Sequence, residues 1–557
     1  MDQYPWYKHY EVGFGPPLVY PENSSVYDLF QETAAKYPNL TATIFMGARM
    51  SFAQLSQQVD RMAAALAQLG IKKQDRVAVM LPNCPQYVIS YLAILRLGAV
   101  VVQVNPLYTE REVENILTDS GAKIAVVIDL MYPRVEKIRS QTSLSHVIFT
   151  RVSEYLPFPI NYLYPWLAKR KGQYPQIKTS PSTINFSELI RNTSGLPPKV
   201  LIDAASDVAV FQYTGGTTGI PKAAMLTHRN LVADTYMSRA IVGSALKEGE
   251  ERVLAVLPFF HSFGLTTTLN LAIAFGSTLI CIPRFEVKAV LKAIDKYRPT
   301  AFPGVPTMYV ALNNYPELHR YDIKSIRVMI SGAAAMPVEV LRQFEAKTGG
   351  VICEGYGLSE ASPVVCCNPC VGVRKPGSIG IPLVGTVCRV VDLETGTREL
   401  APGEVGELIV KGPQVMKGYW NRPEDTAHSL RDGWLYTGDV AKMDEDGYFY
   451  IVDRKKDMII TGGFNVYPRE VEEVLYEHPK IKEAAVVGVP DEYSGERVKA
   501  VVVPKEGETL SEEEVIQWCR QKLTGYKVPR FVEFRDELPL SLVGKVLRRA
   551  LKEEEQN

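Results

Sequence analysis

Apolar and polar residues near the start of the chain follow the period of an amphipathic helix. The apolar positions at this spacing are Phe52, Leu55, Val59, Met62 and Leu66. Ser51 and Gln54 stand at the two positions of a capping box before this run, and Gly70 follows it as a stop signal. The pattern therefore predicts a helix that begins after Ser51 and ends before Gly70.

Apolar runs and helical patterns alternate further along the chain. We expect strands at 77–81, 100–104 and 124–129, and a helix at 85–97. The stretch 87–104 is the best candidate for a membrane span, but it contains Arg96 and Gly98, so it is interpreted as helix, turn and strand. Repeated alternation of helix and strand predicts parallel sheets covered by helices.

Residues 151–198 break this alternation. The prolines of the stretch are Pro157, Pro159, Pro165, Pro175, Pro181, Pro197 and Pro198. They should exclude regular helix over most of it. Aromatic residues between 155 and 166 precede the basic cluster Lys169-Arg170-Lys171, a combination that occurs at membrane interfaces. We favour an insertion that packs on its own domain and keep peripheral membrane contact through 155–171 as a hypothesis.

The character of the chain changes near residue 453. The charged link 453–457 is followed by Gly462-Gly463 and by a helical pattern that opens at Pro468. The apolar face of this helix is Val471, Val474 and Leu475. A strand is expected at 484–489. We predict an N-terminal domain at 1–452 and a small α+β domain at 453–557.

Composition narrows the class of protein. The chain has 557 residues, 46% of them hydrophobic, and a net charge of +0, which indicates a multidomain globular protein without a global electrostatic case for nucleic-acid binding. Eight cysteines in such a length favour a reducing cytoplasm over a disulfide framework. The cluster Cys366, Cys367 and Cys370 lacks a second Cys/His pair at ligand spacing, so we interpret it as structural. Residues 1–9 lack the apolar core of a secretory signal.

The segment 213–228 carries the strongest chemical signal. It reads Tyr-Thr-Gly-Gly-Thr-Thr-Gly-Ile-Pro-Lys-Ala-Ala-Met-Leu-Thr-His and follows an apolar run at 208–211 that predicts a buried strand. Backbone N–H groups of glycines and threonine hydroxyls can bind an anion, and Lys222 adds positive charge. Pro221 precedes Lys222, and Ala223 stands where an NTPase loop has Ser or Thr. The segment therefore predicts a phosphate-binding loop of another kind.

This loop and six further segments, in matching order, resemble the adenylate-forming enzymes, which comprise acyl-CoA synthetases, peptide-synthetase adenylation domains and luciferases. The resemblance covers nearly the whole chain. It departs at Gly216, where many members carry Ser, and at Leu540 and Leu542 near the C-terminus. It implies an α/β fold with a large N-terminal domain of helix-covered sheets and a small, mobile C-terminal α+β domain. In this family a carboxylate attacks the α-phosphate of ATP.

The resemblance also implies a site for ATP and Mg²⁺. The implied nucleotide-binding residues are Thr214, Gly215, Gly216, Thr217, Thr218, Gly219, Lys222, Gly332, Ala333, Ala334, Glu354, Gly355, Tyr356, Gly357, Ser359, Asp439, Arg454 and Lys456. Tyr356 would stack near adenine, and Ser359 would bind the α-phosphate. Glu360 would hold Mg²⁺, with Thr214 as a weaker second ligand, since a hard cation takes carboxylate and phosphate oxygens. Asp439 would accept hydrogen bonds from the ribose hydroxyls.

The catalytic residues implied by the resemblance are Lys545, Glu360, Lys222 and His261. Lys545 would bridge the anionic carboxylate and phosphate. His261 would gate the substrate pocket, with a packing histidine as the alternative. The candidate pocket residues are Met237, Phe260, His261, Val305, Met308, Gly332, Gly357 and Ala361. Asp453 matches the hinge of the C-terminal domain, and Gly462 and Gly463 would shape a tunnel for coenzyme A.

Within the family, the closest resemblance is to bacterial long-chain-fatty-acid–CoA ligases. It rests on 213–219, on 356–363 with 366–369, and on the insertion after 150. The implied reaction converts a fatty acid and ATP to acyl-AMP and pyrophosphate, and acyl-AMP and CoA to acyl-CoA and AMP. The alternatives are a medium-chain or aryl acid–CoA ligase, a peptide-synthetase adenylation domain, a luciferase-like oxygenase, and a non-catalytic acyl-nucleotide or lipid-binding protein. A non-catalytic binding protein should have lost the residues that catalysis needs. The sequence retains all four of them, Lys222, Glu360, Asp439 and Lys545.

Overall fold

The computed structural model describes residues 4–172, 174–214, 221–461, 464–491, 494–540 and 546–553. Its contacts divide the chain into two units. Unit 1 comprises Met1–Val387 and Lys411–Leu435, and unit 2 comprises Cys388–Val410 and Tyr436–Asn557. The domain boundary expected at residue 453 falls inside unit 2 and stays a prediction.

The first sheet of unit 1 has eight strands and is mainly parallel. In spatial order its strands are β19 (Gly418–Tyr419), β9 (Lys222–Thr227), β8 (Val208–Thr214), β4 (Val100–Gln103), β3 (Arg76–Met80), β5 (Ile124–Ile128), β6 (His146–Thr150) and β7 (Thr183–Asn185). Pairing is parallel from β8 through β7 and antiparallel where β9 meets β8 and β19. The strands expected from the apolar runs are therefore confirmed.

The second sheet of unit 1 has nine strands. In spatial order they are β16 (Ile381–Pro382), β15 (Val364–Cys367), β14 (Val351–Gly357), β13 (Val328–Ser331), β12 (Ala301–Gly304), β10 (Arg252–Ala255), β11 (Thr278–Cys281), β1 (Thr41–Phe45) and β2 (Ala48–Ser51). Its centre, from β14 to β1, is parallel, and both edges are antiparallel.

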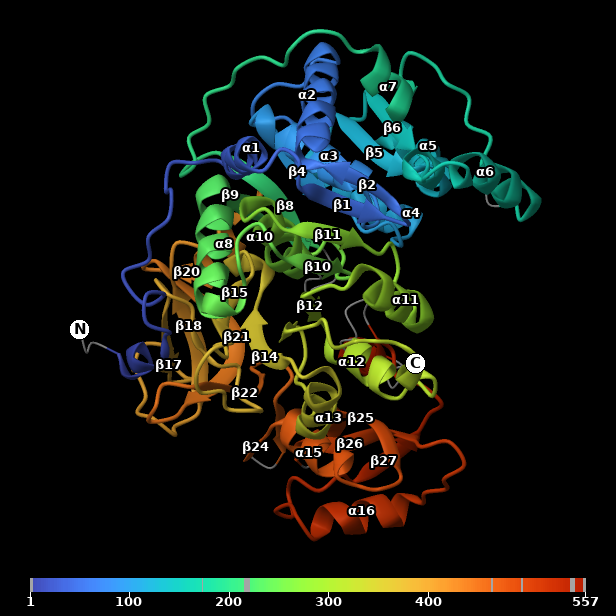
Figure 1. Cartoon of the computed structure of the whole chain (residues 1–557). Coiled ribbons are helices and arrows are strands. Elements are labelled where there is room, and N and C mark those ends of the chain that lie inside the picture. The colour runs from blue at the N-terminus through green and yellow to red at the C-terminus, as the bar shows by residue number, and fades with distance from the viewer. Residues whose placement is uncertain are drawn as a thin grey trace. The chain divides into compact units, whose positions relative to one another are not determined.

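Helices connect and cover these sheets (Figure 1). They are α1 (Val26–Lys36), α2 (Phe52–Gln68), α3 (Pro85–Arg96), α4 (Glu110–Ser120), α5 (Tyr132–Ile138), α6 (Ile160–Arg170), α7 (Phe186–Asn192), α8 (His228–Val242), α9 (Ser262–Gly264), α10 (Leu271–Ala274), α11 (Val287–Tyr297), α12 (Pro306–Asn313), α13 (Val338–Thr348) and α14 (Pro423–Ser429). The capping box of α2 forms as expected, because Ser51 accepts from the N–H of Gln54 and the Gln54 side chain accepts from the N–H of Ser51.

Helix α3 is central to the core of unit 1. Every residue from Pro85 to Leu95 is buried, as expected of a helix covered on all sides. The Tyr87 hydroxyl lies 2.6 Å from Oε1 of Gln103 on β4 and 2.9 Å from the carbonyl oxygen of Phe259, and its single proton is shared between these two acceptors. These bonds join the eight-stranded sheet to the segment that carries His261. Among the described residues, none of the helices combines the length and apolar character needed to span a bilayer.

The proline-rich stretch contains more helix than expected. Helix α6 runs through Pro165, and α7 follows further along. An internal proline removes one helical hydrogen bond and crowds the preceding turn, but residues on either side keep theirs. The expectation that prolines prevent helix here is therefore wrong for 160–170.

Unit 2 contains two small sheets. One includes β17 (Val387–Val391), β18 (Gly406–Lys411), β21 (Trp434–Met443) and β22 (Phe449–Arg454), with the short β20 (Leu430–Arg431) beside the start of β21. The other includes β24 (Phe464–Val466), β23 (Ile459–Thr461), β26 (Gly495–Pro504), β25 (Ile481–Asp491) and β27 (Phe531–Phe534). The helices of the described part of unit 2 are α15 (Pro468–Tyr476), α16 (Glu512–Arg520) and α17 (Arg548–Glu553). The helix expected at Pro468 and the strand expected at 484–489 are confirmed.

Candidate active site

Several implied site residues lie where parallel strands of unit 1 end. In the nine-stranded sheet Gly304 pairs with Ser331, and Ser331 pairs with Glu354, so the implied residues Val305 and Gly332 directly follow paired strand ends. The three paired residues therefore form a row across β12, β13 and β14, and β14 continues to Gly357. In the other sheet β8 ends at Thr214. Ligand sites of parallel sheets form at the carboxyl ends of strands, so the fold presents a suitable edge for a nucleotide.

Glu360 is held by a tyrosine that the sequence pattern did not reveal. Glu360 lies in the short 3-10 turn Ser359–Ala361, and its Oε1 accepts a hydrogen bond from the Tyr419 hydroxyl at 2.7 Å. Burial raises the pKa of Tyr419, and the negative charge of Glu360 raises it further. The tyrosine therefore stays protonated and donates to the carboxylate, and this hydrogen bond fixes one of the two Glu360 oxygens.

Lys222 adjoins the same tyrosine. It begins β9 opposite Thr214, whose hydroxyl donates to the Lys222 carbonyl at 3.4 Å. The ammonium of Lys222 forms an ion pair with Asp425 and lies 5.7 Å from the centroid of the Tyr419 ring. The structure thus brings Lys222, Thr214 and Glu360 together through Tyr419 and Asp425, both of which sequence reasoning missed.

The predicted gate and the predicted phosphate contact meet near the start of α9. The His261 side chain caps this helix, with Nδ1 accepting from the N–H of Phe263 at 3.3 Å. The hydroxyls of Ser262 and Ser359 lie 3.5 Å apart. In this geometry His261 acts as a helix cap, which agrees with the packing alternative. A gating role for His261 is not tested and stays a prediction.

The small-residue segment after β13 is shaped by close contacts. A Cβ at Gly332 would lie 3.0 Å from the Phe263 ring, and Ala333 has a positive φ of 70°. A Cβ at Gly357 would lie 2.1 Å from the carbonyl oxygen of Pro363. Ala333 and Ala334 are exposed. Only glycine fits at 357 without a shift of the Pro363 backbone.

The other implied site residues of unit 1 differ in their burial. Glu354 is buried and accepts from the N–H of Gly377 at 2.9 Å, while Gly355 and Tyr356 are half-buried on β14. The candidate pocket residues that are buried are Met237, Val305, Met308, Gly332 and Ala361, while Gly357 is exposed. Phe260 is half-buried, and its carbonyl accepts from Gln212 at 3.2 Å. A common acyl pocket for these residues stays a prediction.

All eight cysteines are buried, the cluster Cys366, Cys367 and Cys370 among them. In the described part of the chain, no group of His, Cys, Asp and Glu side chains has the arrangement of a metal centre.

In unit 2 Asp439, the implied ribose-binding residue, lies beside Arg454 of the charged link 453–457. Asp439 on β21 pairs in register with Arg454 on β22, and Arg454 Nε lies 3.3 Å from Asp439 Oδ1. Burial lowers the pKa of Lys456, and the charge of Arg454 lowers it further. Asp439 and Arg454 are thus brought together as the resemblance implies, while their contact with a nucleotide stays a prediction.

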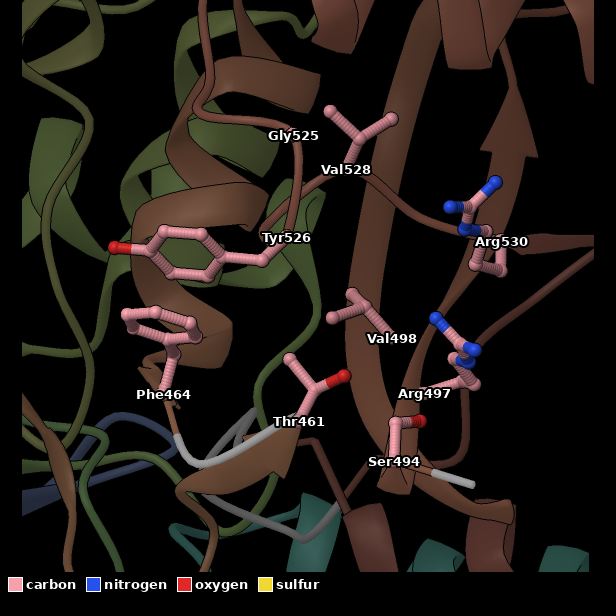
Figure 2. Close-up of a pocket in the computed structure, with 9 residues that line it drawn as sticks. All are labelled: Thr461, Phe464, Ser494, Arg497, Val498, Gly525, Tyr526, Val528 and Arg530. Atoms are coloured by element: carbon pink, nitrogen blue, oxygen red, sulfur yellow. The ribbon is translucent and has the colours of Figure 1, made fainter. Parts of the chain in front are cut away.

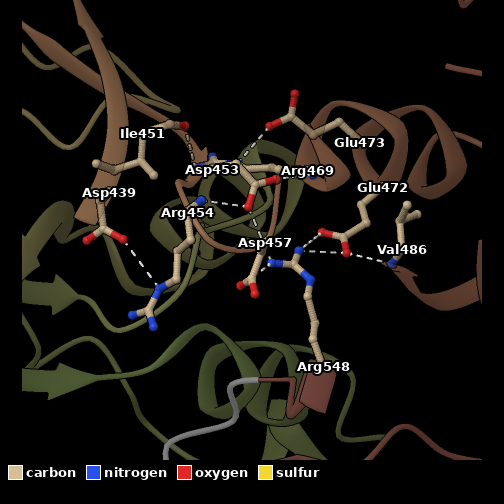
Figure 3. Close-up of polar contacts among 10 residues, drawn as sticks. All are labelled: Asp439, Ile451, Asp453, Arg454, Asp457, Arg469, Glu472, Glu473, Val486 and Arg548. Carbon is tan, nitrogen blue, oxygen red and sulfur yellow. Dashed lines mark hydrogen bonds and ion pairs between the residues drawn. The ribbon is translucent and has the colours of Figure 1, made fainter. Parts of the chain in front are cut away.

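The implied hinge residue Asp453 belongs to a buried charge network (Figure 3). Its carboxylate accepts from the N–H groups of Arg454 at 2.7 Å and Arg469 at 2.8 Å. The Arg548 guanidinium lies 3.4 Å from Asp453 and binds both oxygens of Glu472, at 2.7 and 2.8 Å. Burial raises the pKa values of Asp453 and Glu472, and Arg548 opposes both shifts. Sequence reasoning missed Arg548 and Glu472, because a lone charge carries no periodic signal.

A pocket of about 180 Å³ opens in unit 2 (Figure 2). The rings of Phe464 and Tyr526 stack on one side of it, with centroids 4.6 Å apart and planes 19° apart. Arg497 and Arg530 line the other side. Thr461 and Phe464, which flank the implied tunnel residues, also line it. Stacked rings with nearby guanidinium groups suit a planar base that carries phosphates.

Some of the implied site residues lie outside the described part of the chain. They are 215–219, Gly462, Gly463 and Lys545. Residues 541–545 lie outside the described part as a whole, and on either side of them Leu540 and Val546 form an antiparallel bridge.

Comparison with known proteins decides the family. The sequence profile of the AMP-binding enzyme family matches residues 30–420, and the profile of the AMP-binding enzyme C-terminal domain matches residues 470–545. This chain belongs to the AMP-binding enzyme family. The predicted adenylate-forming fold and family are confirmed.

Relatives of known activity and structure cover the full length. The chain is 50% identical to a long-chain-fatty-acid–CoA ligase of Bacillus subtilis, with 100% of this chain and 99% of the relative aligned. It is 42% identical to the ligase of that name from Escherichia coli, with 99% and 98% aligned. A solved structure of ATP-bound MatB from Rhodopseudomonas palustris matches with a TM-score of 0.83 and 32% identity, over 96% of this chain and 99% of that one. The family assignment therefore applies to the whole chain.

Proposed function

We propose that this protein is a long-chain-fatty-acid–CoA ligase that works through an acyl-AMP intermediate. The observation that carries the proposal is the 50% identity over 100% of this chain to a relative of that activity. The cluster of Lys222, Glu360 and Tyr419 in unit 1 supports it, because a cation and a fixed carboxylate at the end of a parallel sheet suit a nucleoside triphosphate.

In the first step one carboxylate oxygen of the fatty acid attacks the α-phosphorus of ATP. A bond forms between that oxygen and phosphorus, and the bond to the pyrophosphate oxygen breaks. Lys222 would bind the polyphosphate of ATP. The phosphate oxygens would then compete with the Asp425 carboxylate for the Lys222 ammonium. Ser359 and the loop 215–219 would supply further donors, and Lys545 would stabilise charge in the transition state. Asp439 would bind the ribose.

Glu360 fits a Mg²⁺ ion on chemical grounds. Magnesium usually takes one or two protein carboxylates and completes its shell with phosphate oxygens and water. Glu360 is half-buried, and the Tyr419 hydroxyl fixes its orientation. Thr214 would offer a hydroxyl. When bound, the ion would neutralise charge on the polyphosphate.

In the second step the thiol of coenzyme A attacks the acyl carbonyl and releases AMP. Asp453 would be the hinge about which the C-terminal domain rotates. One face of that domain would serve adenylation, and another would serve thioester formation. Gly462 and Gly463 would line the path of the thiol arm. The pocket at Phe464 and Tyr526 follows directly in the chain, and its arginines suit the phosphates of the CoA nucleotide.

A substrate panel tests the proposal. Acids from acetate to oleate, together with coumarate, are incubated with ATP and Mg²⁺, with and without CoA, and pyrophosphate and thioester are measured. We expect thioester formation to be greatest with long chains, because each buried methylene adds about 0.8 kcal/mol. A maximum with coumarate or medium chains would reassign the substrate. Absence of turnover with every acid would contradict the proposal and favour a binding protein.

A further inference from the structure

Helix α6 of unit 1 exposes an apolar face. The exposed apolar and aromatic side chains of this segment, with their relative exposures, are Phe158 (82%), Tyr162 (72%), Trp166 (56%), Leu163 (55%), Leu167 (49%) and Ile160 (44%). Single exposed apolar residues are ordinary on protein surfaces, whereas a contiguous group marks an interaction site. Figure 1 shows α6 at the margin of unit 1, beyond α5.

Helix α6 turns its large apolar side chains toward solvent, whereas a surface helix usually turns them toward the core. The inward face is narrow and includes Asn161, Tyr164 and the buried Ala168, and it contacts the 3-10 turn Val152–Tyr155. The outward face carries the large apolar residues instead of polar ones. The insertion therefore packs on its domain by one side only, and packing does not account for its outer side chains.

Positive charge borders the apolar face. Between Tyr155 and Lys178 the sequence contains four basic residues and no Asp or Glu. Three of the basic residues, Lys169, Arg170 and Lys171, follow one another at the end of the helix and are exposed. The Arg170 guanidinium lies 4.6 Å from the centroid of the Trp166 ring. Aromatic side chains flanked by lysine and arginine are typical of helices that lie in a bilayer interface.

We propose that the segment 155–171 docks this enzyme on an anionic lipid bilayer. Phe158, Leu163 and Trp166 enter the boundary between headgroups and acyl chains, and the basic cluster contacts anionic headgroups. The chemistry favours a bilayer over a protein groove, because bulky apolar side chains spread over an exposed helix suit a deformable surface. The inference also rests on the proposed function, since long-chain fatty acids partition into bilayers and docking would bring the enzyme to its substrate.

Co-sedimentation with vesicles tests the docking separately from catalysis. The full chain is mixed with vesicles of phosphatidylcholine and phosphatidylglycerol in equal parts, or of phosphatidylcholine alone. We expect the chain to sediment with the mixed vesicles and to be released by salt. The variant Phe158→Ser/Leu163→Ser/Trp166→Ser should lose at least about tenfold in partition coefficient. Replacing Lys169, Arg170 or Lys171 by Gln should cost about fivefold for each charge removed.

A matched variant controls for the loss of exposed apolar surface elsewhere. Val19→Ser/Leu196→Ser/Leu201→Ser replaces three apolar residues that are 81%, 85% and 90% exposed, and it should bind vesicles like the wild type. Thermal unfolding should show that all variants are folded, and thioester formation from soluble octanoate should stay unchanged in each. Wild-type binding to the mixed vesicles would hold even if the ligase reaction were misassigned.

The proposal is overturned if the wild-type chain does not bind the mixed vesicles, if it binds neutral vesicles equally well, or if the Phe158→Ser/Leu163→Ser/Trp166→Ser variant binds like the wild type. Light scattering provides a further check. If the wild type is a dimer that this variant dissociates, the apolar face binds a second copy of the chain, and the bilayer assignment is wrong.

Discussion

Replacing Arg548 by Met should destabilise unit 2 far more than removing an exposed ion pair. The guanidinium binds Glu472 through two hydrogen bonds and reaches Asp453 and Asp457 at 3.4 and 3.5 Å. The carboxyl side chains are well shielded, with relative exposures of 12% for Glu472, 2% for Asp453 and 18% for Asp457. The substitution therefore leaves carboxylates that have lost their cation in a poorly solvated site.

The expected magnitude follows from that shielding. Removing one partner of a buried ion pair typically costs 3–5 kcal/mol. The Arg548 side chain is 20% exposed, so we expect the lower end, about 3 kcal/mol of unfolding free energy. Burial already raises the pKa values of Glu472 and Asp453, and loss of Arg548 should raise them further. The folded variant then binds protons more tightly than the unfolded chain, so its deficit should shrink as the pH falls from about 7 to about 5.

Hydrogen exchange of the β25 amides during a urea titration measures this free energy locally. The Lys522→Met variant is the control, because Lys522 and Glu477 form an exposed ion pair in the same unit, with relative exposures of 36% and 59%. It should cost less than about 1 kcal/mol. Equal effects of the two substitutions, or an Arg548→Met deficit that does not change with pH, would refute the reasoning.

Three further predictions concern unit 1. Tyr419→Phe removes the hydrogen bond that orients Glu360, and should raise the Mg²⁺ concentration for half-maximal pyrophosphate release about tenfold; an unchanged Mg²⁺ titration would contradict this role. Burial lowers the pKa of His228 to about 4, so the folded chain resists protonation that the unfolded chain accepts near 6.5. Stability should fall by about 2 kcal/mol between about pH 7 and about pH 5 in urea titrations, and His228→Asn should flatten that slope. Gly357→Ala places a Cβ 2.1 Å from the Pro363 carbonyl oxygen and should cost about 2 kcal/mol. Gly525→Ala is the control, because an added Cβ there has open surroundings, and it should lower the unfolding free energy by less. Equal losses of unfolding free energy would show that the backbone around Gly357 relaxes to accept the Cβ.

Local patterns predicted the elements of the fold well. The capping box at Ser51 and the stop at Gly70 lie within a few residues of the helix they bound, so neighbouring residues suffice to specify it. The parallel sheets followed from helix–strand alternation. Pro165 misled the prediction because its effect is one lost bond and a local clash, while the helix around it can persist.

The site was only partly predictable, because its contacts are distant in sequence. Tyr419 lies 59 residues from Glu360, and Asp425 lies 203 residues from Lys222. They reach the site because β19 pairs with β9 at an antiparallel edge, and no periodicity announces such a pairing. Arg548 likewise meets Glu472 across 76 residues. Resemblance identified Glu360 and Lys222, and only the fold revealed the side chains that hold them.

Isotope transfer tests the central claim of acyl adenylation most directly. The enzyme is given oleate labelled with ¹⁸O in both carboxylate oxygens, together with ATP, Mg²⁺ and CoA, and the nucleotide product is analysed by mass spectrometry. If the carboxylate attacks the α-phosphorus, the AMP released by the CoA thiol carries one ¹⁸O, and Lys545→Ala forms little of it. Unlabelled AMP, or labelled inorganic phosphate together with ADP, would contradict the account.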